Sequence, residues 1–140
     1  MRIMNQTVYL GGAFAQFSPE QVEARQHEVE ALLHTSIKVL KPRHQGGYSP
    51  SLGAALEATL TTRDLLMVRA ANVLILDCLN ATSISRGSVI EMGWASALQK
   101  PFVIIAEEGN PHSFNMSRSL TPFIVPTRAQ AAEIVNTLLT

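Results

Sequence analysis

NVLILD, residues 72–77, is a continuous run of apolar residues that ends in an aspartate. A run without alternating polar residues is typical of a parallel strand that is buried on both faces. A second run of this kind, PFVIIA, occupies residues 101–106. These two runs predict the centre of a parallel sheet that is covered on both sides.

Outward from these runs, short β-rich segments alternate with longer amphipathic ones. The predicted strands are residues 7–12, 37–40, 72–77, 101–106 and 122–126, and the predicted helices are residues 18–34, 52–71, 88–99 and 127–139. We therefore predict an α/β fold: a doubly wound, flavodoxin- or Rossmann-like sheet of five parallel strands with helices on both faces. We expect it to form a single domain over residues 1–140.

Local signals support these helices. Ser18 is placed as an N-cap, with Pro19 at the first helical position and Gln21 as the capping-box partner. The second helix carries an apolar stripe at Leu52, Leu56, Leu60, Met67 and Ala71. The stretches 41–51 and 107–121 are polar and are predicted to be loops.

Composition argues against several classes of function. The chain has 11 Lys and Arg against 11 Asp and Glu, whereas a nucleic-acid partner usually needs a basic surface. No apolar run approaches membrane-spanning length, so we expect no membrane partner. The single cysteine, Cys78, allows no intramolecular disulfide. We expect a cytoplasmic protein in which Cys78 is a core residue; a reactive thiol is the alternative.

Patterns for metals, dinucleotides and hydrolytic triads are missing. The four histidines, His27, His34, His44 and His112, form no spaced pair and no Ser–His–Asp constellation. The chain lacks the GK[ST] of a P-loop, and LGGAFAQFS at residues 10–18 is not a GxGxxG fingerprint. We therefore expect neither a metal nor a cofactor.

Ligands of parallel α/β sheets bind at the carboxyl ends of the strands. This rule selects residues 11–17, 41–51, 77–88 and 107–121 for inspection. Asp77 ends the third predicted strand and points at this region, with turn chemistry as its structural alternative.

Glu91 has two interpretations of equal weight. Ser88 and Glu91 have the S-x-x-E spacing of a capping box. The glutamate is also placed for chemistry, because the positive end of the helix dipole would keep it ionised at neutral pH, as a nucleophile must be. The preceding SRGS, residues 85–88, offers backbone N–H groups to an anion such as phosphate, with Ser85 as the side-chain contact. A simple turn residue is the alternative for Ser85.

Two further polar side chains are candidates. Asp64 falls close to the apolar stripe of its helix, where an acid is costly unless it is paired or used. An ordinary surface ion pair with Arg63 or Arg69 is its alternative. Tyr9 lies in the first strand, where a core tyrosine is the default, yet its hydroxyl is near enough to the strand end to reach a carboxylate.

Three stretches together resemble the nucleoside 2-deoxyribosyltransferase superfamily, which includes the 2'-deoxynucleoside 5'-phosphate N-hydrolases. They are VYLGG (8–12), RDLLMVRAANVLILD (63–77) and GSVIEMGWASALQKPFVII (87–105), and the resemblance covers residues 7 to about 106. It implies that Glu91 is the nucleophile that attacks the anomeric carbon of the sugar. It also implies that Tyr9 orients Glu91, and that Asp64 contacts the sugar and assists departure of the base.

The chain departs from the family pattern at two positions. Ser85 replaces the base-handling aspartate of the transferases and is similar to a serine that contacts the 5'-phosphate in the hydrolases. Ala13, however, stands where those hydrolases have a second phosphate-contacting serine. Nucleoside or 5'-monophosphate, and hydrolysis or transfer, therefore stay open.

The resemblance further implies a homo-oligomer, a dimer or larger, in which a neighbouring subunit lends residues to the site. Asn115, Ser117 or Ser119 are the candidates for that part. The residues assigned to catalysis are Glu91, Asp64 and Tyr9, and those assigned to substrate binding are Gly11, Gly12, Asp77, Ser85, Gly87, Ser88 and Asn115.

The sequence thus predicts an enzyme that cleaves or exchanges the base of a (deoxy)nucleoside or its 5'-monophosphate through a covalent glycosyl-enzyme. The alternative is a nucleotide-binding or sensing module that kept the pocket and lost the chemistry. A purely structural domain, in which Glu91 is only a cap, is a third interpretation.

Overall fold

The computed structural model describes residues 6–42 and 50–140, so the predicted loop at 41–51 is described only at its ends and His44 lies outside the described residues. Five strands form one parallel sheet in the order β2-β1-β3-β4-β5. Their bounds are Thr7–Gly12 (β1), Lys38–Leu40 (β2), Val73–Asp77 (β3), Phe102–Ile105 (β4) and Ile124–Val125 (β5). This is the flavodoxin-like strand order, in which the direction of winding reverses between β1 and β3.

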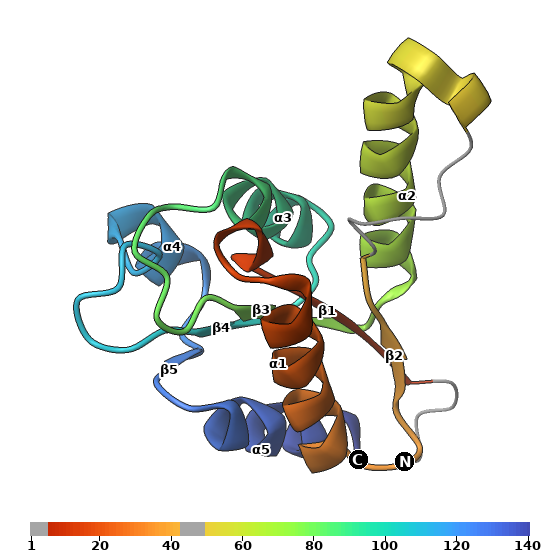
Figure 1. Cartoon of the computed structure of the whole chain (residues 1–140). Coiled ribbons are helices and arrows are strands. Elements are labelled where there is room, and N and C mark those ends of the chain that lie inside the picture. The colour runs from red at the N-terminus through yellow and green to blue at the C-terminus, as the bar shows by residue number, and fades with distance from the viewer. Residues whose placement is uncertain (1–5, 43–49) are drawn as a thin grey trace.

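Helices cover both faces of the sheet, which confirms the predicted α/β architecture (Figure 1). Helices α1 (Pro19–Leu32) and α5 (Arg128–Leu139) pack on one face, and α2 (Leu56–Ala70) and α3 (Arg86–Ala97) pack on the other. Side chains of each strand alternate between the two faces. In β3, Val73 and Ile75 enter the core beneath α1 and α5, while Leu74 and Leu76 enter the core beneath α2 and α3.

The predicted start of α1 is confirmed. Ser18 is the N-cap and Pro19 opens the helix. The Gln21 amide N–H donates to the Ser18 hydroxyl at 3.2 Å, and the Ser18 N–H donates to the Gln21 side-chain oxygen at 2.9 Å. Both bonds of the capping box are therefore made, and they satisfy two N–H groups that a helix start leaves unpaired.

The predicted start of α3 was wrong by two residues. The helix begins at Arg86, and Ser85 is its N-cap, because the Ser85 hydroxyl accepts the Ser88 N–H at 3.2 Å. Ser88 already lies inside the helix and is fully buried. The S-x-x-E capping box at residues 88–91 therefore does not form, and Glu91 lies in the second turn.

The stretch 107–121 is not wholly a loop, because it contains the short helix α4 (Asn115–Leu120). The buried Ser117 hydroxyl accepts the Phe114 N–H at 2.9 Å and donates to the His112 carbonyl at 2.8 Å. The sequence did not predict this helix because its residues are mostly polar. Its buried serine, Ser117, looks like a loop residue in the sequence but bonds backbone groups inside the protein. Two short 3-10 helices, Phe14–Gln16 (η1) and Pro50–Ala55 (η2), were also not predicted.

The amino-terminal part of helix α2 projects away from the sheet together with η2, while its carboxyl-terminal end packs on the sheet (Figure 1). Of the α2 residues only Val68 is buried, and Leu66 is 58% exposed. Leu52, Leu56 and Leu60 of the predicted stripe are partly exposed, so most of that stripe does not enter the core. None of the helices within residues 6–42 and 50–140 is long and apolar enough to cross a membrane.

Candidate active site

A cavity of about 720 Å³ lies at the carboxyl edge of the sheet, next to the point where the winding reverses. Its walls come from the end of β1, from η1 and the first half of α1, and from the segment that leads into α3. Gly12, Ser85, Gly87 and Glu91 line it, and all four were predicted from the sequence. The position is the one expected for a ligand site in a doubly wound sheet.

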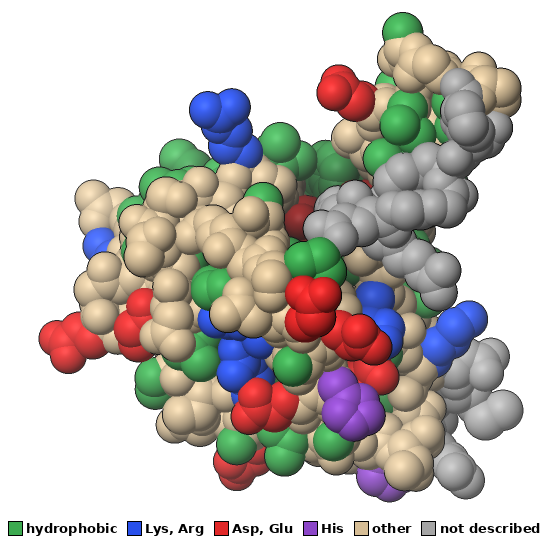
Figure 2. Space-filling view, viewed as in Figure 1, with side chains coloured by type: hydrophobic (Ala, Val, Ile, Leu, Met, Phe, Trp, Pro, Cys, Tyr) green, Lys and Arg blue, Asp and Glu red, His purple; other side chains and the backbone are tan. Residues whose placement is uncertain are grey.

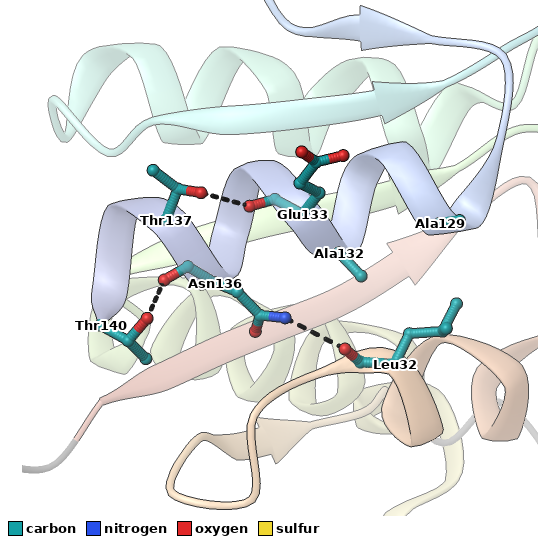
Figure 3. A pocket seen from close by; sticks show the side chains of 7 residues that line it. All are labelled: Leu32, Ala129, Ala132, Glu133, Asn136, Thr137 and Thr140. Atoms are coloured by element: carbon teal, nitrogen blue, oxygen red, sulfur yellow. Dashed lines mark hydrogen bonds between the residues drawn. The ribbon is translucent and has the colours of Figure 1, made fainter.

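A second cavity, of about 330 Å³, lies between α1 and α5 (Figure 3). Its polar side chains are mostly engaged within the protein. The Asn136 amide donates to the Leu32 carbonyl, and the hydroxyls of Thr137 and Thr140 donate to backbone carbonyls of α5. This leaves Glu133 as the only charged side chain on its wall, so the first cavity is the better candidate for chemistry.

Glu91 and Tyr9 lie against each other at the end of β1. A methyl group placed on Gly11 would come within 2.6 Å of Glu91 Oε2 and 2.8 Å of a Tyr9 ring carbon. Only a glycine leaves room for this approach, which explains why β1 ends without a side chain. Tyr9 is fully buried, on the same face of the sheet as α3.

Burial raises the pKa of Glu91 to about 7, the Tyr9 hydroxyl lowers it, and the Asp64 carboxylate raises it. Burial also raises the pKa of Tyr9, and the charges of Glu91 and Asp64 act in the same direction. Neither the Tyr9 hydroxyl nor Glu91 Oε2 completes a hydrogen bond with a described residue. Both atoms are therefore free to form a hydrogen bond. Leaving a buried polar atom without a partner costs free energy, so these two atoms are candidates to bind a ligand.

The expectation that Glu91 is fully ionised at neutral pH was wrong. A pKa of about 7 leaves similar amounts of the two forms there. The helix dipole acts over about the first turn, and Glu91 lies beyond it, so removal from water outweighs it.

Asp64 completes a group of three. It projects from α2 with a side chain that is 16% exposed, and its charge acts on both Glu91 and Tyr9. The ion pair with Arg63 is long, 3.5 Å between Nη2 and Oδ1. The fold thus brings Tyr9, Asp64 and Glu91 together from β1, α2 and α3.

Asp77 was assigned to the substrate, but it lies on the other side of the sheet. Its carboxylate accepts Arg128 Nε at 2.8 Å and lies 3.6 Å from Arg25 Nη1, with a side chain that is 1% exposed. Like Val73 and Ile75, it has the strand parity of the face covered by α1 and α5. Asp77 is therefore a structural ion-pair residue that joins β3 to these helices.

The remaining assigned residues differ in position. Gly12 has a φ of 153°, and a methyl group there would lie 2.2 Å from the Asp77 carbonyl oxygen, so this position requires glycine.

Ser88 is buried beside Cys78 and does not line the cavity. Burial raises the pKa of the Cys78 thiol to about 12, which confirms a core cysteine rather than a reactive one. Asn115 is exposed on α4, where it accepts Arg118 at 2.6 Å, and it also lies outside the cavity.

Several residues that line the cavity were not predicted from the sequence. Phe14, Gln16 and Phe17 come from the segment 11–17 that the strand-end rule had selected, and Arg86 opens α3 beside Ser85. The Arg25 guanidinium stacks on the Phe17 ring at 3.7 Å, which holds one aromatic wall of the cavity. No local pattern marked these residues, because an aromatic side chain in a loop is ordinarily core.

Charge is not gathered into a basic surface on the face seen in Figure 2, where acidic and basic side chains lie intermixed over α1 and α5. Within the described ranges, no three His, Cys, Asp or Glu side chains are grouped so that they could hold a metal ion.

A flavodoxin-like sheet with a carboxylate-bearing cavity at its switch point has the arrangement in which such sheets bind small molecules. The sequence profile of the nucleoside 2-deoxyribosyltransferase family matches residues 8–132, and the chain belongs to this family. The curated proteins contain no match to it.

Solved structures agree with this fold. The 2-deoxyribosyltransferase of Leishmania mexicana is 25% identical with a TM-score of 0.58 over 72% of this chain, which spans 64% of that protein. The 2-deoxyribosyltransferase of Bacillus psychrosaccharolyticus is 18% identical with a TM-score of 0.70 and 90% coverage of both chains. A CMP N-glycosidase of Clostridium botulinum is 18% identical with a TM-score of 0.61, over 96% of this chain and all of the other.

Proposed function

We propose that this protein cleaves or exchanges the N-glycosidic bond of a (deoxy)nucleoside or its 5'-monophosphate, with Glu91 as the nucleophile. The observation that carries this proposal is the half-buried Glu91 carboxyl, which lines the cavity, lies against Tyr9 and is acted on by the charge of Asp64. Membership of the family supports the same class of reaction, and the names of the relatives associate this fold with both deoxyribosyl transfer and N-glycosidase activity.

In the proposed reaction, a Glu91 carboxylate oxygen bonds to the anomeric carbon while the bond from that carbon to the base nitrogen breaks. The bonding electrons leave with the base, which takes up a proton from water, and the Asp64 carboxylate is proposed to contact the sugar and to assist this departure. The transition state resembles an oxocarbenium ion, as in retaining glycosidases. Water or a second base then attacks the same carbon and frees Glu91.

Tyr9 has the role of orienting and tuning Glu91. Its hydroxyl lowers the pKa of a carboxyl that burial alone would raise further. With its own pKa raised, Tyr9 stays protonated and can donate its hydrogen to the Glu91 carboxylate. Removing the hydroxyl would leave the glutamate more fully protonated at neutral pH.

Ser85 and Arg86 are the proposed contacts for the 5' end of the substrate. The Ser85 oxygen accepts the Ser88 N–H, which leaves its O–H free to donate to a phosphate or a sugar hydroxyl. The Arg86 cation follows Ser85 on the same wall. This pair favours a monophosphate over a nucleoside, although the buried Ala13 supplies no hydroxyl.

A substrate panel tests the function. The protein is incubated with ribo- and deoxyribonucleosides and their 5'-monophosphates, with and without an acceptor base, and released or exchanged base is measured. We expect base release from at least one substrate, and a loss of at least about 10³-fold with Glu91→Gln, because a covalent nucleophile is removed. Glu23→Gln is the matched control, since Glu23 lines the same cavity from α1 without being part of the group around Tyr9.

Two results would contradict the proposal. One is the absence of base release from every substrate; if calorimetry then shows nucleotide binding, the non-catalytic binding module is the correct function. The other is a Glu91→Gln variant that releases base as fast as the parent protein.

A further inference from the structure

The segment between β3 and α3 is held in place from the β4 side by a buried histidine. His112 follows β4 and is fully buried. Its Nε2 lies 2.8 Å from the backbone nitrogen of Ser85, the residue that caps α3 and lines the cavity. The proposed reaction gives no part to His112.

The hydrogen bonds around His112 determine which ring nitrogen carries the proton. The Ser85 N–H can only donate, so Nε2 must accept and therefore be unprotonated. The proton is then on Nδ1, which lies 2.9 Å from the Asn110 side-chain oxygen. The same oxygen also accepts the His112 N–H at 2.9 Å.

The orientation of Asn110 is itself determined by its neighbours. Its amide nitrogen donates to the Cys78 carbonyl at 2.7 Å and to the Glu107 carboxylate at 3.0 Å. Both partners accept only, so the amide cannot be turned around. A continuous chain of hydrogen bonds thus runs from the end of β3, through Asn110 and His112, to the start of α3.

We propose that His112 is a positioning residue: its neutral imidazole accepts the Ser85 N–H and thereby places the start of α3 against the substrate cavity. Two observations support this role. Burial lowers the pKa of His112, although the Glu107 charge opposes the effect, and the neutral form is the one that can accept. Gln16 holds the same segment from the opposite side, where its amide donates to the Ser83 carbonyl at 2.6 Å and accepts the Thr82 N–H at 3.0 Å.

The consequence for activity rests on the proposed function. Ser85 is the proposed contact for the 5' end of the substrate, and Glu91 lies on the same helix. Without an acceptor at Nε2, the half-buried Ser85 N–H loses its partner and the segment relaxes. A displacement of about 1 Å in a positioning element can reduce activity about 10²-fold.

A pair of variants isolates the acceptor. In His112→Gln the side-chain oxygen reaches about as far as Nε2, so it can accept the Ser85 N–H. In His112→Asn the amide ends near the position of Nδ1 and cannot reach Ser85. Both variants remove the ring, so a general packing defect affects both, and thermal melting checks that they are comparably folded.

We expect kcat/KM for base release to stay within about threefold of the parent for His112→Gln and to fall about 10- to 100-fold for His112→Asn. His34→Gln, at an exposed histidine beyond the end of α1, is the control for loss of a histidine and should be unchanged. Equal losses in the Gln and Asn variants would overturn the proposal.

Nuclear magnetic resonance tests the geometry without activity. Long-range ¹H–¹⁵N spectra of the parent should show the Nδ1–H tautomer of His112, and the Ser85 amide proton should shift upfield in His112→Asn more than in His112→Gln. An Nε2–H tautomer, or an unmoved Ser85 amide, would overturn the proposal. If the parent releases no base from any substrate, the proposed function fails, and these spectra alone decide the role of His112.

Discussion

At the scale of single residues, the protonation state of Glu91 affects both the stability of the fold and the proposed activity. Its pKa is raised from 4.5 to about 7 in the folded protein. Between these values the folded state holds the proton and the unfolded state does not, so the free energy of unfolding falls as the pH rises. Above the folded pKa this loss of stability is complete and amounts to about 3 kcal/mol. The proposed chemistry needs the ionised form, so activity should rise over the same range.

We therefore predict that Glu91→Gln stabilises the protein at pH 8 by about 3 kcal/mol relative to the parent and has little effect at pH 5. A neutral amide avoids the burial of a charge that the parent carries above its pKa. Urea unfolding of both proteins at the two pH values measures this difference. A stability difference that is equal at pH 5 and pH 8 would contradict the raised pKa.

At the scale of the elements, the ion pairs of Asp77 join β3 to α1 and α5. Asp77 is buried between Arg128 and Arg25, and Arg128 also pairs with Glu28 at 2.8 Å. We predict that Asp77→Asn lowers the free energy of unfolding by about 3 kcal/mol, because two guanidinium groups lose their buried counter-charge. Glu28→Gln, at a side chain that is 56% exposed, should cost less than about 1 kcal/mol.

Urea unfolding of the two variants at pH 7 measures these effects. The folded fraction of Asp77→Asn should keep base-release activity, since Asp77 lies outside the cavity. A stable but inactive Asp77→Asn variant would instead support the role in substrate binding that the sequence predicted for Asp77.

At the scale of the whole molecule, the projecting α2 helix exposes apolar side chains. Asp64 reaches the site from α2, yet much of that helix leaves its apolar side chains outside the core of its own subunit, and hydrophobic side chains show on it in Figure 2. Leu66 on α2 and Ile90 on α3 are both more than half exposed, on the two helices that cover this face of the sheet. We propose that a second copy of the chain covers this face, since exposed apolar surface marks protein contacts.

We predict that the protein sediments as a dimer or larger species at micromolar concentration, and that Leu66→Lys shifts it toward the monomer. Leu138→Lys is the matched control, because Leu138 is an exposed leucine on α5, which covers the other face of the sheet. Analytical ultracentrifugation distinguishes the two. A monomeric parent, or equal effects of the two substitutions, would contradict this interface.

Patterns that repeat along the chain predicted the fold well. The apolar runs of β3 and β4 and the capping signals of α1 depend on neighbouring residues, and such local chemistry can be read without a structure. Short polar elements were harder to predict. Helix α4 was missed because its serine bonds buried backbone groups, which the sequence does not reveal. The start of α3 was misplaced because Ser85 and Ser88 are both plausible caps, and only backbone geometry distinguishes them.

By itself, the sequence determined the alternation of strands and helices and the edge of the sheet where the candidate cavity lies. Through its resemblance to a family, it also pointed to the group of Tyr9, Asp64 and Glu91. Only the tertiary structure decided which polar residues face the cavity and what their surroundings do to them. Asp77 turned out to be a buried ion-pair residue, the pKa of Glu91 was raised by burial, and His112 was joined to Ser85. The physical reason is that burial and hydrogen-bond partners come from segments distant in sequence, which local patterns do not record.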